Sequence, residues 1–216
     1  MIRVIGLGAG GHAKVLIDIL RRAGDFEIVG LLDPVRAGEI VAGVPILGDD
    51  EQLHIMRAAG VTAVFIGVGG AGDNSIRMAL YEKALAAQFV LVNAIHPTAI
   101  VASSVKFGQG VAIMAGVILN PDVRIGDNVI VNTGAIVEHD CDIGSHAHIS
   151  PGAVLSGGVS VGRGAHVGAG ATVRQYIQIG DGAIVGAGAA AVKDVPPRTV
   201  VVGVPARPRE FNPKKT

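Results

Sequence analysis

From residue 95 to residue 189 the sequence repeats an apolar pattern every six residues. A large apolar residue begins each unit, and a second, mostly small apolar residue follows four positions later. Sixteen units follow one another without a slip, and their first positions are Ile95, Val101, Phe107, Ile113, Leu119, Ile125, Val131, Val137, Ile143, Ile149, Leu155, Val161, Val167, Val173, Ile179 and Val185. Two inward positions in six residues do not fit the 3.6-residue period of a helix. They are typical of a narrow solenoid whose sides are short strands.

Before this repeat, aliphatic runs alternate with helical patterns. The runs predict strands over 2–8, 27–33, 62–69 and 89–95, and the helical patterns predict helices over 11–23, 49–60 and 73–88. Such alternation predicts a small parallel sheet with helices on its faces. We therefore predict two domains: a small α/β Rossmann-like domain over residues 1–92, and a solenoid with a C-terminal tail over residues 93–216.

The composition limits the partners of this chain. Lys plus Arg and Asp plus Glu both total 18, so the net charge is zero and no basic patch indicates nucleic acid. Half of the residues are hydrophobic but only 3% are aromatic, so the core is expected to be aliphatic. The single cysteine fits a reducing compartment. We expect a cytoplasmic protein, since neither a signal peptide nor a membrane-spanning run is evident.

The stretch "GLGAGG" at residues 6–11 has the form of a dinucleotide fingerprint, and Asp33 follows about twenty residues later. This leaves an NAD-dependent oxidoreductase as a competing function. A complete NAD domain needs two mononucleotide halves, however, and 92 residues supply little more than one. One half suits a single nucleotide, with its diphosphate at the start of the first helix.

The stretch "EHDCDIGSHAHIS" at residues 138–150 collects three histidines, three acidic residues and the one cysteine. Cys141 stands at an inward position of the repeat, which predicts a small core residue. His139, His146 and His148 stand at other positions, facing outward or along edges of the coil. Because a zinc site needs ligands that converge on one point, we predict no metal here.

The units "IGDNVI", "IGDGAI" and "VGAGAT" resemble the hexapeptide-repeat family, which implies a left-handed parallel β-helix with three units to each coil. Residues 1–208 resemble a narrower group, the bacterial nucleotide-sugar N-acetyltransferases, on the segments "GAGGHAKV" (8–15), "VNAIHPTA" (92–99), "EHDC" (138–141), "VKDVPP" and "VVGVPAR". That group includes UDP-4-amino-sugar and GDP-perosamine N-acetyltransferases and sialic acid O-acetyltransferase-like proteins. The resemblance implies an acetyl-CoA-dependent transferase that is usually a homotrimer.

The resemblance also implies the roles of individual residues. His139 matches the catalytic base and Asp140 the carboxylate beside it, although some relatives have Glu at that position. A base near neutral pKa suits the reaction because the attacking amine must lose a proton, and a neighbouring carboxylate raises the basicity of an imidazole. His148 matches a residue that contacts the acetyl-CoA thioester. The small residues expected along CoA are Gly168, Ala169, Gly186 and Ala187, and Arg207 is either a contact to the CoA phosphate or a solvated tail residue. The residues expected around the nucleotide sugar are Gly10, Gly11, His12, Asp33, Pro34 and Gly69.

The sequence thus predicts N-acetylation of the amino group of a UDP- or GDP-linked amino sugar, for cell-surface glycan biosynthesis. O-acetylation of a free sugar such as sialic acid is the alternative, and an inactive scaffold is a further one. Half a coil separates His139 from His148 in the sequence. We therefore expect them on well-separated parts of one subunit, with an active site shared between subunits.

Overall fold

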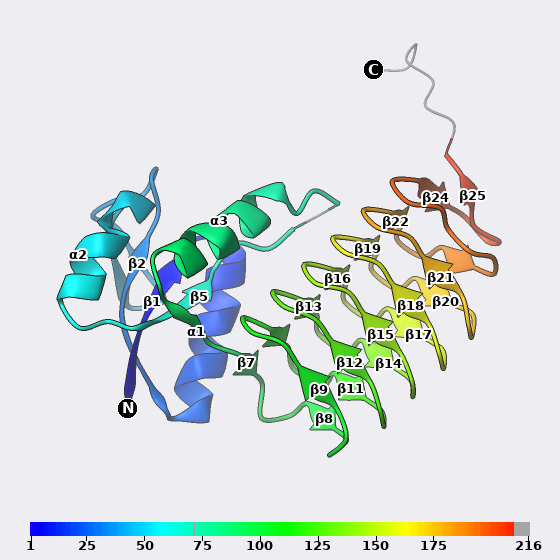
Figure 1. Ribbon diagram of the computed structural model, residues 1–216, viewed down its shortest axis with the longest axis horizontal. Coiled ribbons are helices and arrows are strands. Elements are labelled where there is room, and N and C mark those ends of the chain that lie inside the picture. Colours follow the sequence, from blue (N-terminus) through cyan, green and yellow to red (C-terminus); the bar gives the residue numbers. More distant parts are fainter. Residues whose placement is uncertain (71, 210–216) are drawn as a thin grey trace, which may run out of the picture.

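A computed structural model describes residues 1–70 and 72–209, so residues 210–216 of the predicted C-terminal tail lie outside the described residues. The first part of the chain forms a six-stranded sheet in the order β3-β4-β2-β1-β5-β6 (Figure 1). Its strands are β1 (Ile2–Leu7), β2 (Phe26–Leu32), β3 (Ile40–Val41), β4 (Val44–Gly48), β5 (Ala63–Ile66) and β6 (Val90–Leu91). All pairs are parallel except β3–β4. The predicted parallel sheet is confirmed.

The helices of this part are α1 (Gly11–Ala23), the short 3₁₀-helix η1 (Asp50–Gln52), α2 (Leu53–Ala58) and α3 (Ser75–Ala86). Helix α1 ends at Gly24, whose φ of 79° is the left-handed conformation that glycine adopts easily. The helix predicted over 49–60 is instead divided into η1 and α2. The β3–β4 hairpin was not predicted, because its two-residue turn, Ala42–Gly43, lacks the Asn or Asp that usually precedes glycine there.

The second part forms a parallel β-helix with three sides (Figure 1). Two-residue strands that are three repeat units apart pair with each other, as in Ala112 with Ile130 and Ile118 with Ile136. The predicted coil of three units is therefore confirmed. The last coil is shorter, because Val200 pairs with Ile184, and β25 folds back antiparallel onto β24.

We name the three sides by what covers or lines them. The docked side consists of β7 (Ala94–Ile95), β10 (Ala112–Ile113), β13 (Ile130–Val131), β16 (His148–Ile149), β19 (His166–Val167), β22 (Ile184–Val185), β24 (Val200–Val202) and β25 (Arg207–Pro208). The apolar side consists of β8 (Ile100–Val101), β11 (Ile118–Leu119), β14 (Ile136–Val137), β17 (Val154–Leu155), β20 (Thr172–Val173) and β23 (Ala190–Ala191). The polar side consists of β9 (Lys106–Phe107), β12 (Arg124–Ile125), β15 (Asp142–Ile143), β18 (Ser160–Val161) and β21 (Gln178–Ile179).

The interior of the coils is the aliphatic column that the repeat predicts. One continuous cluster of buried residues runs from Val111 to Val201 through both inward positions of each six-residue unit. Cys141 belongs to this cluster and is 1% exposed, which confirms it as a core residue. Each buried Val, Leu or Ile side chain contributes about 1.5–3 kcal/mol, so the column is the main source of stability for the β-helix.

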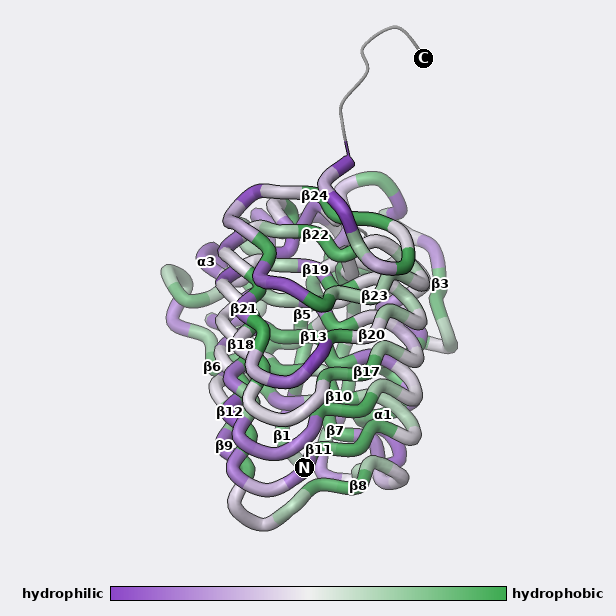
Figure 2. Tube along the Cα trace, turned by 90° about the vertical axis from the view of Figure 1, so that its right-hand side faces the viewer, coloured by the Kyte–Doolittle hydropathy of each residue, from purple (hydrophilic) through white to green (hydrophobic). Residues whose placement is uncertain are grey.

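The outward-facing residues differ on the three sides. On the docked side Ala94, Ala112, Met114 and Ile130 pack against α1 of the small domain, which lies over the first coils (Figure 1). The polar side presents an exposed row, Lys106, Arg124, Asp142, Ser160 and Gln178. The apolar side presents Ile100, Ile118, Ile136 and Val154, and Figure 2 shows the contrast between the green tube of β8 and β17 and the purple tube of β9 and β12. Within the described residues, one side of the β-helix therefore carries an apolar row that no other segment covers.

No helix in the described part of the chain is long and apolar enough to cross a membrane.

Candidate active site

His139 lies in the turn between β14 and β15, at the corner where the apolar and polar sides meet. Its Nδ1 is 2.7 Å from Oδ2 of Asp140, and both side chains are exposed. A carboxylate only accepts hydrogen bonds, so Nδ1 carries the proton and Nε2 is left as an acceptor. The hydrogen bond to Asp140 raises the pKa of His139 above its ordinary value. The pair therefore has the form of a base held in one tautomer by a carboxylate.

His148 lies on β16 of the docked side and makes two hydrogen bonds. Its Nδ1 donates to the Gly70 carbonyl at 2.7 Å, and its Nε2 accepts from Nδ2 of Asn132 at 3.2 Å. Burial, with the neighbouring His166 ring 5.0 Å away, lowers the pKa of His148 to about 3. His148 is therefore a neutral imidazole with both nitrogens engaged.

His146 and His148 point out of the coil, as the sequence predicts. The small domain covers the surface onto which they point. His146 is 1% exposed and His148 is 6% exposed. The repeat encodes the direction of a side chain relative to its own coil, and the domain that covers it is a separate part of the sequence.

A cavity of about 570 Å³ opens on the docked side above His148. It brings together five residues that the resemblance assigns to acetyl-CoA, all but Arg207, and its lining is Gly70, Gly72, His148, Ser150, Pro151, His166, Gly168, Ala169, Ile184, Val185, Gly186, Ala187, Val200, Val202 and Arg209. Gly168 is required by the stacking of the coils, since a Cβ there would lie 2.5 Å from the backbone nitrogen of Ala187. Ala169 and Ala187 add only a methyl group each, so this wall of the cavity stays open.

Arg207 does not line this cavity. Its Nη1 donates to the carbonyl of Ala206, and it borders a separate hollow beside Lys193. Arg209 faces the cavity instead. Sequence reasoning missed Arg209 and Ser150. His166 stands one full coil after His148, which predicts that the two rings are neighbours, and their centroids are 5.0 Å apart; that both line the cavity was not predicted.

Within one chain, His139 and this cavity lie on opposite parts of the triangular section. His139 occupies the corner between the apolar and polar sides, and the cavity opens on the third side. None of the residues from Ile136 to Ile143 lines the cavity. The half-coil spacing predicted this separation.

The glycine-rich loop of the small domain leaves open space at the start of α1. Gly10 is the N-cap residue and Gly11 the first helical residue, and a Cβ built at either would meet no atom within 4 Å. His12 follows and is half-buried beside Gly69, whose Cβ would lie 3.5 Å from that of His12. Burial, with the charge of Arg77, lowers the pKa of His12 to about 4. The loop thus offers backbone N–H groups and a neutral imidazole to an anionic ligand.

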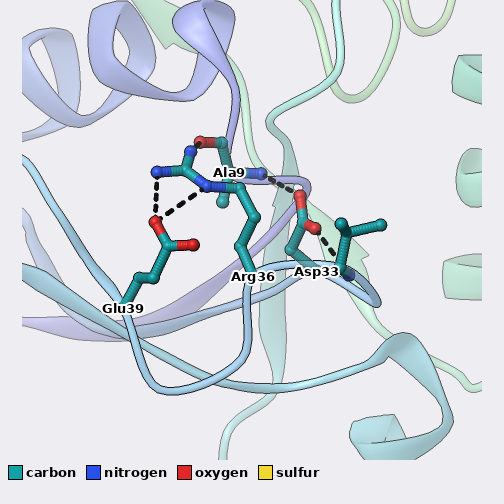
Figure 3. Close-up of polar contacts among 5 residues, drawn as sticks. Ala9, Asp33, Arg36 and Glu39 are labelled. Atoms are coloured by element: carbon teal, nitrogen blue, oxygen red, sulfur yellow. Dashed lines mark hydrogen bonds and ion pairs between the residues drawn. The ribbon is translucent and has the colours of Figure 1, made fainter.

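Asp33 ties the end of β2 to this loop (Figure 3). Its Oδ2 accepts from the Ala9 N–H at 2.9 Å, and its Oδ1 accepts from the Val35 N–H at 3.1 Å. Arg36, which sequence reasoning missed, donates to the Ala9 carbonyl at 2.6 Å and pairs with Glu39 at 2.6 Å (Figure 3). Each oxygen of Asp33 keeps one lone pair for a ligand. A second cavity, of about 310 Å³, is lined by Gly8, Leu32, Asp33, Pro34, Val35, Asp50, Val68, Ile76 and Leu80.

Among the residues that the structure describes, no group of three or more His, Cys, Asp or Glu side chains lies close enough to hold a metal ion.

Two family models match this chain. The model described as the PglD N-terminal domain matches residues 3–84. The model described as bacterial transferase hexapeptide (six repeats) matches residues 122–157 and 140–175.

Solved structures match over nearly the whole chain. Perosamine N-acetyltransferase from Caulobacter crescentus, solved with CoA and GDP-perosamine, is 46% identical, with a TM-score of 0.90 over 95% of this chain and 96% of that one. The acetyltransferase domain of PglB from Neisseria gonorrhoeae FA1090 is 38% identical, with a TM-score of 0.90 over 97% of this chain and 100% of that one.

A curated relative, the UDP-N-acetylbacillosamine N-acetyltransferase of Bacillus subtilis (strain 168), is 40% identical over 120 residues. That match covers 53% of this chain and 52% of the relative, so it spans about half of the relative's length. The resemblance seen in the sequence is confirmed: with its small α/β domain and its left-handed β-helix, the chain belongs to the hexapeptide-repeat family of bacterial nucleotide-sugar N-acetyltransferases.

Proposed function

We propose that this chain transfers the acetyl group of acetyl-CoA to the amino group of a UDP- or GDP-linked amino sugar. The observation that carries the proposal is the His139–Asp140 pair, an exposed imidazole whose Nδ1 is held at 2.7 Å by a carboxylate and whose Nε2 is left to accept a proton. The ligands of the relatives, CoA and GDP-perosamine in one and acetyl-CoA in another, support it. We place the reaction in the cytoplasm, since the buried single cysteine fits a reducing compartment.

The two parts of the chain divide the work in this proposal. Residues 1–92 bind the nucleotide, with Gly10 and Gly11 at the diphosphate and the cavity beside Asp33 and Pro34 at the nucleoside. Residues 93–216 carry the acetyl transfer, with CoA along the cavity that Ala169 and Ala187 line.

In the reaction, the sugar nitrogen attacks the thioester carbon while Nε2 of His139 removes a proton from that nitrogen. The C–N bond forms, the C–S bond breaks, and the thiolate of CoA leaves and takes up a proton. Asp140 stabilises the imidazolium that His139 becomes, because its carboxylate accepts the Nδ1 proton. His148 stays neutral, since its pKa of about 3 lies far below neutrality, so in this proposal it lines the thioester site and takes no part in proton transfer.

The active form proposed here is a homotrimer with sites shared between subunits. The apolar side is the surface to be buried in the trimer. It presents Ile100, which is 65% exposed, followed on successive coils by Ile118, Ile136 and Val154. The turn of His139 lies at one edge of this side and the turn of Ala169 at the other. A heterologous contact that closes about a threefold axis can therefore bring His139 of one subunit to the cavity of the next.

A mass-shift screen tests the proposal. The protein is incubated with acetyl-CoA and a panel of UDP- and GDP-linked amino sugars, with the corresponding hydroxyl sugars as controls. We expect one acetyl group to be added to an amino sugar, and none to its hydroxyl counterpart. Acetylation confined to hydroxyl sugars would overturn the proposed reaction.

The same assay tests His139. His139→Ala should lower turnover by roughly 10²–10⁴-fold, with little change in melting temperature because the side chain is exposed. His54→Ala, an exposed histidine on α2, is the matched control and should keep full activity. A loss below about fivefold in His139→Ala would exclude His139 as the main base.

A further inference from the structure

Helix α3 holds the small domain on the β-helix through a buried arginine. Arg77 is 1% exposed, and its guanidinium donates from Nη1 to the carbonyl of Asn128 and from Nη2 to the carbonyl of His146, the latter at 2.6 Å. Asn128 and His146 occupy the same position of the repeat on successive coils. One planar guanidinium thus contacts two coils at once.

Asn74, at the N-cap of α3, makes the same kind of contact one coil further along. Its Nδ2 donates to the carbonyl of His146 at 3.2 Å and to the carbonyl of Gly164 at 3.1 Å, which again belong to successive coils. Asn128, His146 and Gly164 all have φ between 53° and 66°, and their carbonyls take no part in the hydrogen bonds between coils. Arg77 and Asn74 therefore contact the equivalent carbonyls of three successive coils along one corner of the β-helix.

These contacts are poorly suited to stabilising the fold. No carboxylate pairs with Arg77 among the described residues, its Nε and the Oδ1 of Asn74 have no hydrogen-bond partner there, and burial lowers the pKa of Arg77 to about 10. Desolvation of a buried charge without a counter-ion offsets much of what its hydrogen bonds contribute, so these contacts add less stability than their number suggests. Their main consequence is therefore the position of the small domain along the β-helix.

A repeating surface does not by itself determine at which coil another domain docks. Every coil offers the same carbonyl about 4.8 Å from the last one, so a domain held by apolar contacts alone can dock one coil too high or too low. The side chains at this corner break the repeat, because Asn128 and His146 stand between Gly110 and Gly164.

These two side chains match α3 in one register only. Nδ2 of Asn128 donates to the Arg77 carbonyl at 3.3 Å and to Nδ1 of His146 at 2.9 Å. The His146 ring meets the Tyr81 ring edge-on, with centroids 5.2 Å apart. A shift by one coil would place a glycine against one of these partners and lose its bonds.

We propose that Arg77 and Asn74 set the coil register of the small domain on the β-helix, and so act as positioning residues for the acetyl transfer. The proposal rests on the function proposed above. The register determines where the start of α1 and the Gly70 carbonyl lie relative to His148, and so where a nucleotide-linked amine lies relative to the thioester. Misplacement by about 1 Å costs about 10²-fold in rate, and a slip of one coil is several times larger.

A distance measurement tests the register without using activity. Spin labels are placed at Lys14→Cys on α1 and Gln178→Cys on the polar side, both exposed, in labelled chains diluted into unlabelled ones. The native Cys141 is buried and stays unlabelled. The chain with native Arg77 should give one narrow distance, and Arg77→Met should add a population displaced by up to about 4.8 Å. Arg3→Met, an exposed arginine that also donates to a backbone carbonyl, should leave the distance unchanged.

Kinetics with two acceptors give the second readout. Arg77→Met should lower kcat/KM for the nucleotide-linked amino sugar by about 10²-fold. It should leave acetylation of the same amino sugar without its nucleotide within about twofold, because that acceptor does not use the small domain. Arg77→Lys, which keeps the charge but reaches one carbonyl, and Asn74→Ala should give smaller losses of the same selectivity if Arg77→Met does not fold.

Equal losses with both acceptors would mean a general loss of structure and would overturn the proposal, as would an unchanged distance together with unchanged kinetics. If the unsubstituted chain acetylates neither acceptor, the proposed reaction fails, and the spin-label distances still decide the register.

Discussion

The imidazole of His139 lies directly over Gly157, the residue one coil further along the same corner. A Cβ at Gly157 would lie 2.7 Å from both Cε1 and Nε2 of His139. The backbone does not require glycine here, since its φ is not positive and the same turn position holds Ser103, Pro121 and Gln175 in other coils. The missing side chain therefore leaves room for the imidazole of His139.

Gly157→Ala should displace this imidazole. We expect turnover to fall at least about tenfold, because the base moves by an ångström or more from its working position. The melting temperature should change little, since residue 157 lies at a half-exposed corner outside the aliphatic column. Gln175→Ala, one coil further on, is the matched control and should be silent. Turnover in Gly157→Ala equal to that of the unsubstituted chain would show that His139 does not need this position.

Asp140→Asn should shift the acidic limb of the kcat/KM profile. The base must be neutral, so activity falls as pH drops through the pKa of His139. Asp140 raises that pKa, which places the limb above the ordinary value of about 6.5. The amide removes the charge, so the limb should move to lower pH while the plateau rate falls. A limb at the same pH in both proteins would mean that another group titrates.

Gly11→Val should abolish binding of the nucleotide sugar and leave binding of acetyl-CoA intact. The valine enters space that is open in the structure, so it should block the ligand without disturbing α1. Isothermal titration calorimetry measures the binding of the nucleotide sugar, of acetyl-CoA and of NADH. NADH should not bind. Tight binding of NADH would favour the dehydrogenase interpretation of the "GLGAGG" loop instead.

Mixed trimers test the shared site. His139→Ala chains lack the base, and Ala169→Trp chains should block the cavity wall, where residue 169 is exposed enough to accept the ring. Each variant alone should be nearly inactive. Trimers refolded from an equal mixture should recover about a quarter of the activity, since half of the bases and half of the walls are intact and combine at random. If trimers shown to be mixed recover nothing, both groups act within one subunit.

The repeat in the sequence determined the β-helix, the length of its coil and the residues of its core, because each six-residue unit carries its own inward positions. It also placed Cys141 in the core and His139 and His148 on separate parts of the section. The strand–helix alternation predicted the parallel sheet, but not the β3–β4 hairpin, whose Ala42–Gly43 turn has a weak signal. These successes share one cause: the pattern that specifies each feature is local.

The surroundings of the outward side chains were decided only by the tertiary structure. The burial of His146 and His148, the contacts of Arg77 with two coils and the hydrogen bond from Ala9 to Asp33 all depend on segments that lie far apart in the chain. Arg209 lines the cavity and Arg207 does not, because of the way β25 folds back on β24. The periodic pattern of the sequence does not predict these contacts, because they depend on where one folded part docks on another. In our proposal a few polar side chains specify that docking at one register of a repeating surface.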